Sequence, residues 1–161
     1  MNTKQIALSI VRPTLQGIGL WSTAAEQLVL GTGLVESNLD AIEQQGGPAV
    51  SLWQIEEPTY DDCWVNYLKA QPWSGRVKYY SIQNWSLKEY PDFVQLKGNL
   101  YLACAMCRVV YARKPAPLPQ AGDLQGLAEY WKEWYNTPLG AGKPEDFIGR
   151  AASCVKPETW S

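Results

Sequence analysis

The chain has 161 residues, a formal net charge of −2 and an ordinary share of hydrophobic side chains, which together fit one folded domain, 1–161, with a buried core. This charge provides no broad basic surface, so neither nucleic acid nor an anionic membrane is expected as a partner. Because the chain contains no histidine, the common zinc hydrolases and the Ser-His-Asp and Cys-His enzymes are excluded, and any acid–base chemistry must use carboxylates, Tyr or Lys, with no metal or other cofactor expected.

The first part of the chain is predicted to form two helices separated by a proline. Residues 3–11 have the pattern of a short helix that Pro13 should end. The apolar run in this segment is too short for a signal peptide, and we expect no export signal and no transmembrane span. A second helix is predicted for 23–37, where Thr23 and Glu26 fit a capping box at its start.

The rest of the chain alternates loops with predicted helices. Gly46-Gly47-Pro48 predicts a loop over 38–50, and the apolar stretch 51–55 fits either an extended strand or a turn. Segment 71–97 is interrupted by prolines and a glycine and gives no clear prediction. Further helices are predicted at 59–69, 99–113, 123–135 and 144–153, with Asn99, Asp123 and Pro144 at their starts. The sequence therefore predicts a mainly α fold, or an α+β fold at most, with a very small strand element.

The four cysteines are Cys63, Cys104, Cys107 and Cys154, and their redox state is open. Cys104 and Cys107 form a Cys-x-x-Cys pair within a predicted helix rather than in a turn that could present metal ligands. We therefore interpret the cysteines as small buried residues. A zinc site built from all four is the alternative.

Glu36 is the candidate acid. It lies at the end of a predicted helix and shares a helix face with Leu28, Val29 and Thr32, so burial should partly remove its carboxyl group from water. The last turn of a helix also disfavours negative charge. Both effects raise the pKa of a carboxyl group toward the range that a general acid needs. A surface glutamate that merely ends a helix is the alternative interpretation.

Features on either side of Glu36 favour the functional interpretation. Gly31 and Gly33 weaken a helix interior, which suggests close approach of another backbone or of a ligand. After the glycine-containing loop come Trp53 and Gln54, a flat aromatic ring and an amide. Such a pair suits a sugar ring that carries an N-acetyl group, with Trp53 as the best candidate for stacking on it.

These residues resemble the motifs of the soluble lytic transglycosylases and goose-type lysozymes. Glu36-Ser37 resembles the Glu-Ser pair that ends a helix in that family, and SLWQI at 51–55 resembles its Gly-Leu-x-Gln-Ile segment. WYNT at 134–137 resembles its Ala-Tyr-Asn-Ala-Gly motif. The segments SLWQIEEPTYDD, AMCRVVY and YWKEWYNTPLGAG are also similar to a subgroup encoded by tailed bacteriophages. The similarity extends from Arg12 to Ile148.

The resemblance implies a lysozyme-like fold and specific residue roles. Glu36 would protonate the glycosidic oxygen between N-acetylmuramic acid and N-acetylglucosamine in peptidoglycan. Ser37 would hold the sugar or orient Glu36, Gln54 would contact the substrate, and Tyr135 would hydrogen-bond near Glu36 or the N-acetyl group. Asn136, the next residue of the same motif, would also line the substrate site.

The reaction type depends on a second carboxylate. Hydrolysis with inversion needs one to activate water, and Glu56 is the nearest candidate by sequence, although it equally fits a helix start. Without it, the 6-hydroxyl of the muramic acid can attack the sugar cation and give a 1,6-anhydro product, the outcome that the resemblance favours. Ser51 replaces the family's glycine, which adds a side chain where backbone normally lies near the cleft.

Two functions follow as hypotheses. The first is a lysin in a phage virion, associated with the tail and with other tail proteins, that cuts the wall in the host periplasm during genome entry. The second is a structural or adaptor protein of the tail that keeps the fold without turnover. An endolysin released at the end of infection is a third option.

Overall fold

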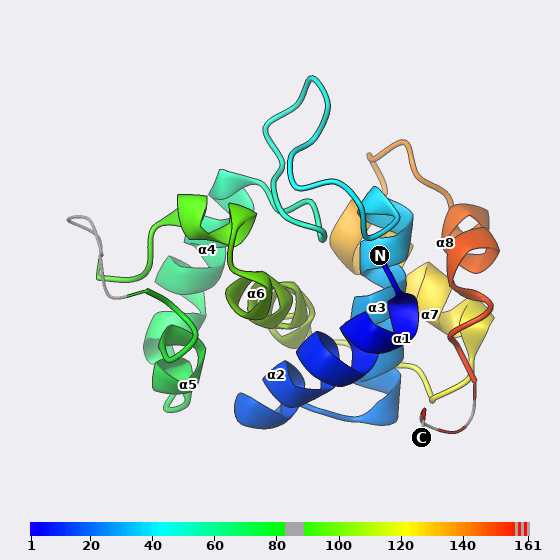
Figure 1. The fold of residues 1–161 in the computed structure, drawn as a ribbon, viewed down its shortest axis with the longest axis horizontal. Helices are drawn as coiled ribbons and strands as arrows, with labels where there is room; N and C mark the ends of the chain where they lie inside the picture. Colours follow the sequence, from blue (N-terminus) through cyan, green and yellow to red (C-terminus); the bar gives the residue numbers. More distant parts are fainter. Residues whose placement is uncertain (83–88, 157, 159, 161) are drawn as a thin grey trace.

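The computed structural model describes residues 1–82, 89–156, 158 and 160, and it confirms the mainly helical prediction. Figure 1 shows α6 (Leu100–Ala112) between two groups of helices. One group holds α4 (Glu57–Asn66) and α5 (Ser74–Lys78), and the other holds α3 (Thr23–Ser37), α7 (Leu124–Trp131) and α8 (Pro144–Ala151). A continuous core of buried hydrophobic side chains joins the two groups.

The N-terminal helix does not end at Pro13, contrary to prediction. Helix α1 (Thr3–Ile6) continues through a π turn (Ala7–Val11) into α2 (Arg12–Gly17) without a break. Proline lacks an N–H and crowds the carbonyl one turn earlier, and the wider π turn just before it gives the ring room.

Helix α3 is the central element of its group. It packs against α6, α7, α8 and the π turn of the N-terminal helix, and every residue from Ala24 to Leu34 is buried. The face that Glu36 shares with Leu28, Val29 and Thr32 is buried as expected, and the other faces of the helix are buried too, because partners surround it. Ser22 is the N-cap, with its Oγ accepting from the Ala25 N–H at 3.0 Å, which places Glu26 too far along the helix for the predicted capping box.

The glycines of α3 make room for side chains rather than for a ligand or another backbone. A Cβ at Gly31 would lie 2.3 Å from the Phe147 ring, and one at Gly33 would lie 2.5 Å from Leu39 and 3.2 Å from the Trp53 ring nitrogen. The prediction from these glycines was therefore wrong about what approaches them.

The segment after α3 is a loop followed by a tight turn. The backbone pairs only at isolated bridges, Glu43 with Val50 and Val50 with Ile55. Ser51 and Gln54 take left-handed backbone conformations, with φ of 73° and 50°. Of the two alternatives for this stretch the turn is correct, and the described residues contain no strand.

The second half of the chain follows the predicted capping residues. Asn99 Oδ1 accepts from Leu102 N–H at 3.0 Å at the start of α6, and Asp123 Oδ1 accepts from Gly126 N–H at 2.9 Å at the start of α7. Helix α7 continues into a π turn (Lys132–Asn136). Segment 71–97, which carried no clear prediction, holds α5 and a 3₁₀ turn at Phe93–Lys97, while 83–88 lie outside the described residues. The helix predicted at 59–69 is α4, which ends earlier, at Asn66, and a 3₁₀ turn at Leu68–Ala70 follows it.

All four cysteines are buried free thiols, which confirms their interpretation as small core residues. Burial raises the pKa of Cys63 and Cys154 to about 11 and that of Cys104 and Cys107 well above the usual range. Within the described ranges, no group of three or more Cys, Asp or Glu side chains is placed to hold a metal ion. None of the helices described is both long and apolar enough to cross a membrane.

Candidate active site

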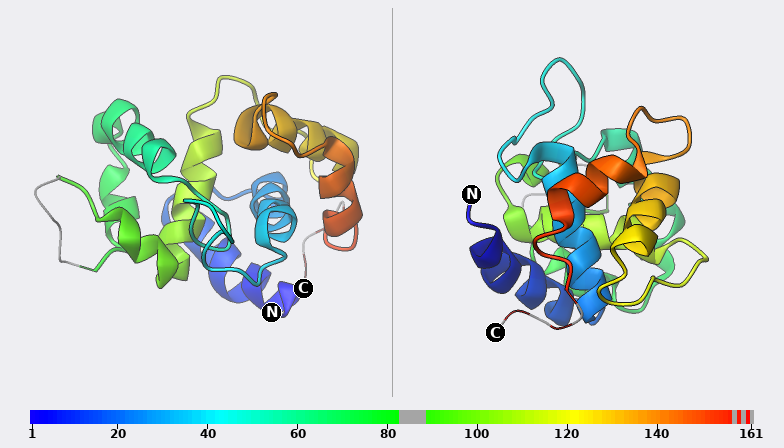
Figure 2. Two further views of the ribbon diagram at one scale, coloured as in Figure 1. Left: turned by 90° about the horizontal axis from the view of Figure 1, so that it is seen from above. Right: turned by 90° about the vertical axis from the view of Figure 1, so that its right-hand side faces the viewer.

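Most of the predicted site residues meet at one open hollow of about 250 Å³, where the end of α3, the loop that leads to α4 and the π turn after α7 come together. Figure 2, seen from above, shows the loop segment lying between α4 on one side and α3 and α8 on the other. The hollow is lined by Glu36, Gln44, Ala49, Gln54, Glu56, Tyr135 and Asn136.

Glu36 lies in the last turn of α3 and is half-buried. Its Oε1 accepts a hydrogen bond from the indole Nε1 of Trp131 at 2.9 Å. Burial raises the pKa of Glu36 to about 7, and the Trp131 hydrogen bond opposes part of that rise. A carboxyl group with this pKa holds a proton in about half of the molecules at neutral pH, as a general acid requires.

Ser37 joins the end of α3 to the turn below the hollow. Its Oγ donates to the Leu52 carbonyl at 2.6 Å and lies 3.3 Å from the Gly33 carbonyl. Because the hydroxyl proton is already used inside the protein, Ser37 fits the orienting role implied by the resemblance better than a sugar-binding role.

Trp53 does not face the hollow, so its prediction as a stacking platform for sugar is wrong. The side chain is fully buried, and its Nε1 donates to the Val29 carbonyl at 2.9 Å. The turn 51–54 points the ring inward against Gly33, which has no side chain to exclude it. Trp53 instead supports the site through its backbone, whose carbonyl accepts from Tyr135 Oη at 2.6 Å.

Ser51 occupies a backbone conformation that favours glycine, with φ of 73°. Its side chain is 2% exposed and does not line the hollow, and its Oγ accepts from the Trp53 N–H at 3.2 Å. The expectation that Ser51 adds a side chain near the cleft is therefore wrong, because the turn points this side chain into the protein.

Gln54, Tyr135 and Asn136 all line the hollow with Glu36. Gln54 Nε2 donates to the Ser51 carbonyl at 2.8 Å, which fixes the amide. The Tyr135 ring stacks on Tyr111 with 5.2 Å between centroids. Burial raises the pKa of Tyr135 well above its usual value, so its hydroxyl stays protonated and can donate but cannot act as a base.

Glu56 brings a second carboxyl group to the hollow. It is exposed and stands at the N-cap position of α4, where its side chain makes no capping hydrogen bond. Both interpretations of Glu56 therefore hold in part: it stands at the start of α4, and it also lines the hollow.

The sequence prediction missed Trp131, Gln44 and Ala49 as site residues. Trp131 stands four residues before Tyr135, and two residues at this spacing share one face of a helix. That spacing, together with the assignment of Tyr135 to the site, was a usable signal. Gln44 and Ala49 belong to the loop, whose path no local pattern defines.

Comparison of the chain with protein-family models, with curated proteins and with solved structures finds no match. The resemblance to lytic transglycosylases therefore depends on the motifs at Glu36-Ser37, 51–55 and 134–137.

Proposed function

We propose that the chain is a lysozyme-like enzyme that cleaves the β-1,4 bond between N-acetylmuramic acid and N-acetylglucosamine in peptidoglycan, with Glu36 as acid and then base. The observation that carries the proposal is a half-buried carboxyl group with a pKa of about 7 at an open hollow lined by polar side chains. A general acid needs this protonation state, and a long glycan strand needs an open site rather than an enclosed one.

In the first step Glu36 gives its proton to the glycosidic oxygen as the bond from that oxygen to the sugar C1 breaks. The second sugar leaves with a free hydroxyl, and C1 becomes an oxocarbenium-like centre beside the Glu36 carboxylate. In the second step the muramic acid 6-hydroxyl attacks C1 and gives its proton to Glu36, which closes the 1,6-anhydro ring. The acid is then restored for the next cycle.

Hydrolysis is the alternative second step, and the position of Glu56 favours it. Its exposed carboxylate lines the same hollow as Glu36 and can take a proton from a water that attacks C1. Replacing Glu56 separates the two routes, because the anhydro route needs only Glu36.

The test is digestion of purified peptidoglycan followed by mass spectrometry of the released muropeptides. Glu36→Gln should lower the rate by about 10²- to 10⁴-fold, while Glu129→Gln, an exposed residue of α7, should cleave at the wild-type rate. Anhydro ends that persist in Glu56→Gln support the lyase route. Reducing ends that disappear in Glu56→Gln support hydrolysis. Equal release by wild type and Glu36→Gln would overturn the catalytic assignment.

For the biological setting we propose a lysin associated with a phage tail, acting on the host cell wall in contact with other tail proteins. The alternative is a structural tail protein without turnover. The replacement of the family's glycine by Ser51 does not favour it, because the Ser51 side chain is buried and does not line the hollow. Glycan cleavage that depends on Glu36 would count against the structural alternative. Absence of the chain from purified particles of an infecting phage would instead favour an endolysin.

A further inference from the structure

Trp131 is the residue that holds the carboxyl group of Glu36. An indole N–H can only donate, so Oε1, which lies 2.9 Å from Trp131 Nε1, must accept. In a neutral carboxyl group the oxygen that accepts in this way is the carbonyl oxygen, and the proton is on the other oxygen. Among the described residues, Oε2 has no hydrogen-bond partner, so it is the oxygen free to meet a substrate.

We infer that Trp131 is a positioning residue that fixes Oε1 of Glu36 and thereby assigns the transferable proton to Oε2. The inference rests on the proposed function, since it names the atom from which the proton leaves.

The indole is held firmly enough for this role. Trp131 is 2% exposed, and its ring packs against the Phe147 ring of α8, with 6.0 Å between the two ring centroids. A Cβ at Gly142 would lie 2.6 Å from the far edge of the indole, so that loop closes tightly on the ring. Phe147 in turn fills the space left by Gly31 of α3. The donor is therefore fixed by packing against Phe147 of α8 and against the loop at Gly142.

The same hydrogen bond also serves the second step. After Glu36 loses its proton, the carboxylate is half-buried, and the Trp131 N–H remains to stabilise the charge. The other titratable groups that face Glu36 are Cys107 and Tyr111 of α6, Tyr135 of the π turn and Glu56 in the hollow. None of these is a cation, and Tyr135 and Tyr111 direct their hydroxyls to the Trp53 carbonyl and to Thr32, so among the described residues the indole N–H is the donor to the Glu36 carboxylate.

The test is a comparison of the Glu36 pKa in the wild type and in variants of the intact chain. Trp131→Phe removes the donor but also shrinks the ring, so a second variant carries β-(3-benzothienyl)alanine at position 131, which keeps the indole shape and lacks the N–H. Trp134→Phe is the matched control, because it removes an indole N–H from the following π turn. The pKa is read from the side-chain ¹³C carboxyl signal of Glu36, assigned with Glu36→Gln.

Loss of the donor removes an interaction that favours the charged form, so the pKa should rise from about 7 by about one unit in both position-131 variants. It should stay unchanged in Trp134→Phe. In the active enzyme the alkaline limb of the kcat profile should move up by the same amount, with a larger fall in kcat than change in KM. A purely structural role for Trp131 would leave the pH profile in place.

An unchanged Glu36 pKa in the benzothienylalanine variant would overturn the inference. Failure of the wild type to cleave peptidoglycan is a separate result. It would remove the proposed function, while the pKa comparison still decides whether Trp131 holds the carboxyl group.

Discussion

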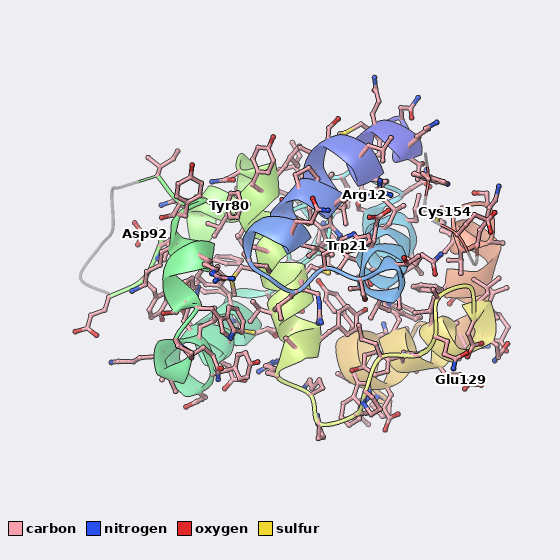
Figure 3. The ribbon with its side chains drawn as sticks, turned by 90° about the horizontal axis from the view of Figure 1, so that it is seen from below. Arg12, Trp21, Tyr80, Asp92, Glu129 and Cys154 are labelled. Atoms are coloured by element: carbon pink, nitrogen blue, oxygen red, sulfur yellow. The ribbon has the colours of Figure 1, made fainter. Side chains whose placement is uncertain are left out.

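The two ends of α3 each carry a glutamate, and the protein treats them in opposite ways. Glu26, in the first turn, is 5% exposed and accepts from Arg12 Nε at 2.8 Å, Arg12 Nη2 at 2.9 Å and Trp21 Nε1 at 2.8 Å. Figure 3 shows Arg12 and Trp21 beside the start of the helix. Glu36, in the last turn, has an indole donor as well, but among the residues that the structure describes no cation lies beside it.

This difference shows that burial alone does not define the role of a carboxyl group. At the start of the helix a guanidinium and the helix dipole both stabilise the negative charge, and the Glu26 pair raises the pKa of Arg12. At the end of the helix the dipole opposes the charge, and a neutral indole is the partner. The first arrangement ties α2 to α3, whereas the second keeps a proton available at an open hollow.

The largest effect is expected from breaking the charged pair. Glu26→Gln should lower the free energy of unfolding by about 3 to 4 kcal/mol, because it leaves the Arg12 guanidinium without its counter-charge in a mostly buried position. Urea denaturation at pH 7 measures this. Glycan cleavage per folded molecule should stay at the wild-type level. A stability loss below about 1 kcal/mol would show that solvent already screens the pair.

At the other end of α3, replacing the glutamate is expected to raise the free energy of unfolding rather than lower it. The folded pKa of Glu36, about 7, lies above its ordinary value of 4.5, so the folded protein loses stability as pH rises through that window. Glu36→Gln removes the free-energy cost of ionising this carboxyl group in the folded protein. The variant should therefore have a free energy of unfolding about 2 to 3 kcal/mol higher at pH 8, with little change at pH 4. Denaturation curves at both pH values test this. A Gln variant equally or less stable at pH 8 would mean that Glu36 ionises without penalty.

The smallest effect is expected in the turn 51–54, which the hydrogen bond from Ser37 Oγ to the Leu52 carbonyl joins to the end of α3. Ser51 has φ of 73°, where glycine is relaxed and other residues are strained. Ser51→Gly should be more stable than Ser51→Ala by about 1 kcal/mol, since alanine keeps the strain and loses the hydroxyl. Thermal denaturation of the two variants gives the difference. Equal stability would show that the turn carries no strain.

The sequence predicted best those features that depend on residues close together in the chain, such as the starts of helices. The starts of α6, α7 and α8 follow from Asn99, Asp123 and Pro144, because a capping side chain or an N-terminal proline acts within one turn of its own position. Pro13 was wrongly expected to end its helix because no local pattern in the sequence indicates the π turn at Ala7–Val11, through which the helix continues past the proline.

At the site, Glu36 at the end of α3 and four other lining residues (Gln54, Glu56, Tyr135 and Asn136) were predictable, but Gln44, Ala49 and the supporting contacts were not. The Trp131–Glu36 hydrogen bond joins residues 95 positions apart, and no periodicity connects such a pair. Trp53 was misassigned because the inward direction of its ring depends on the left-handed residues on either side of it and on the space at Gly33. An aromatic residue near a candidate acid is consistent with both a sugar platform and a core anchor.

The most direct test of the central claim is the pH dependence of kcat for glycan cleavage by the wild-type chain. Because the working form of Glu36 carries its proton, the rate should fall about tenfold for each pH unit above an apparent pKa near 7. The residual activity of Glu36→Gln should not show this fall in rate above pH 7. A wild-type rate that holds constant from pH 6 to 9 would contradict the account, because the proton would then come from a group other than Glu36.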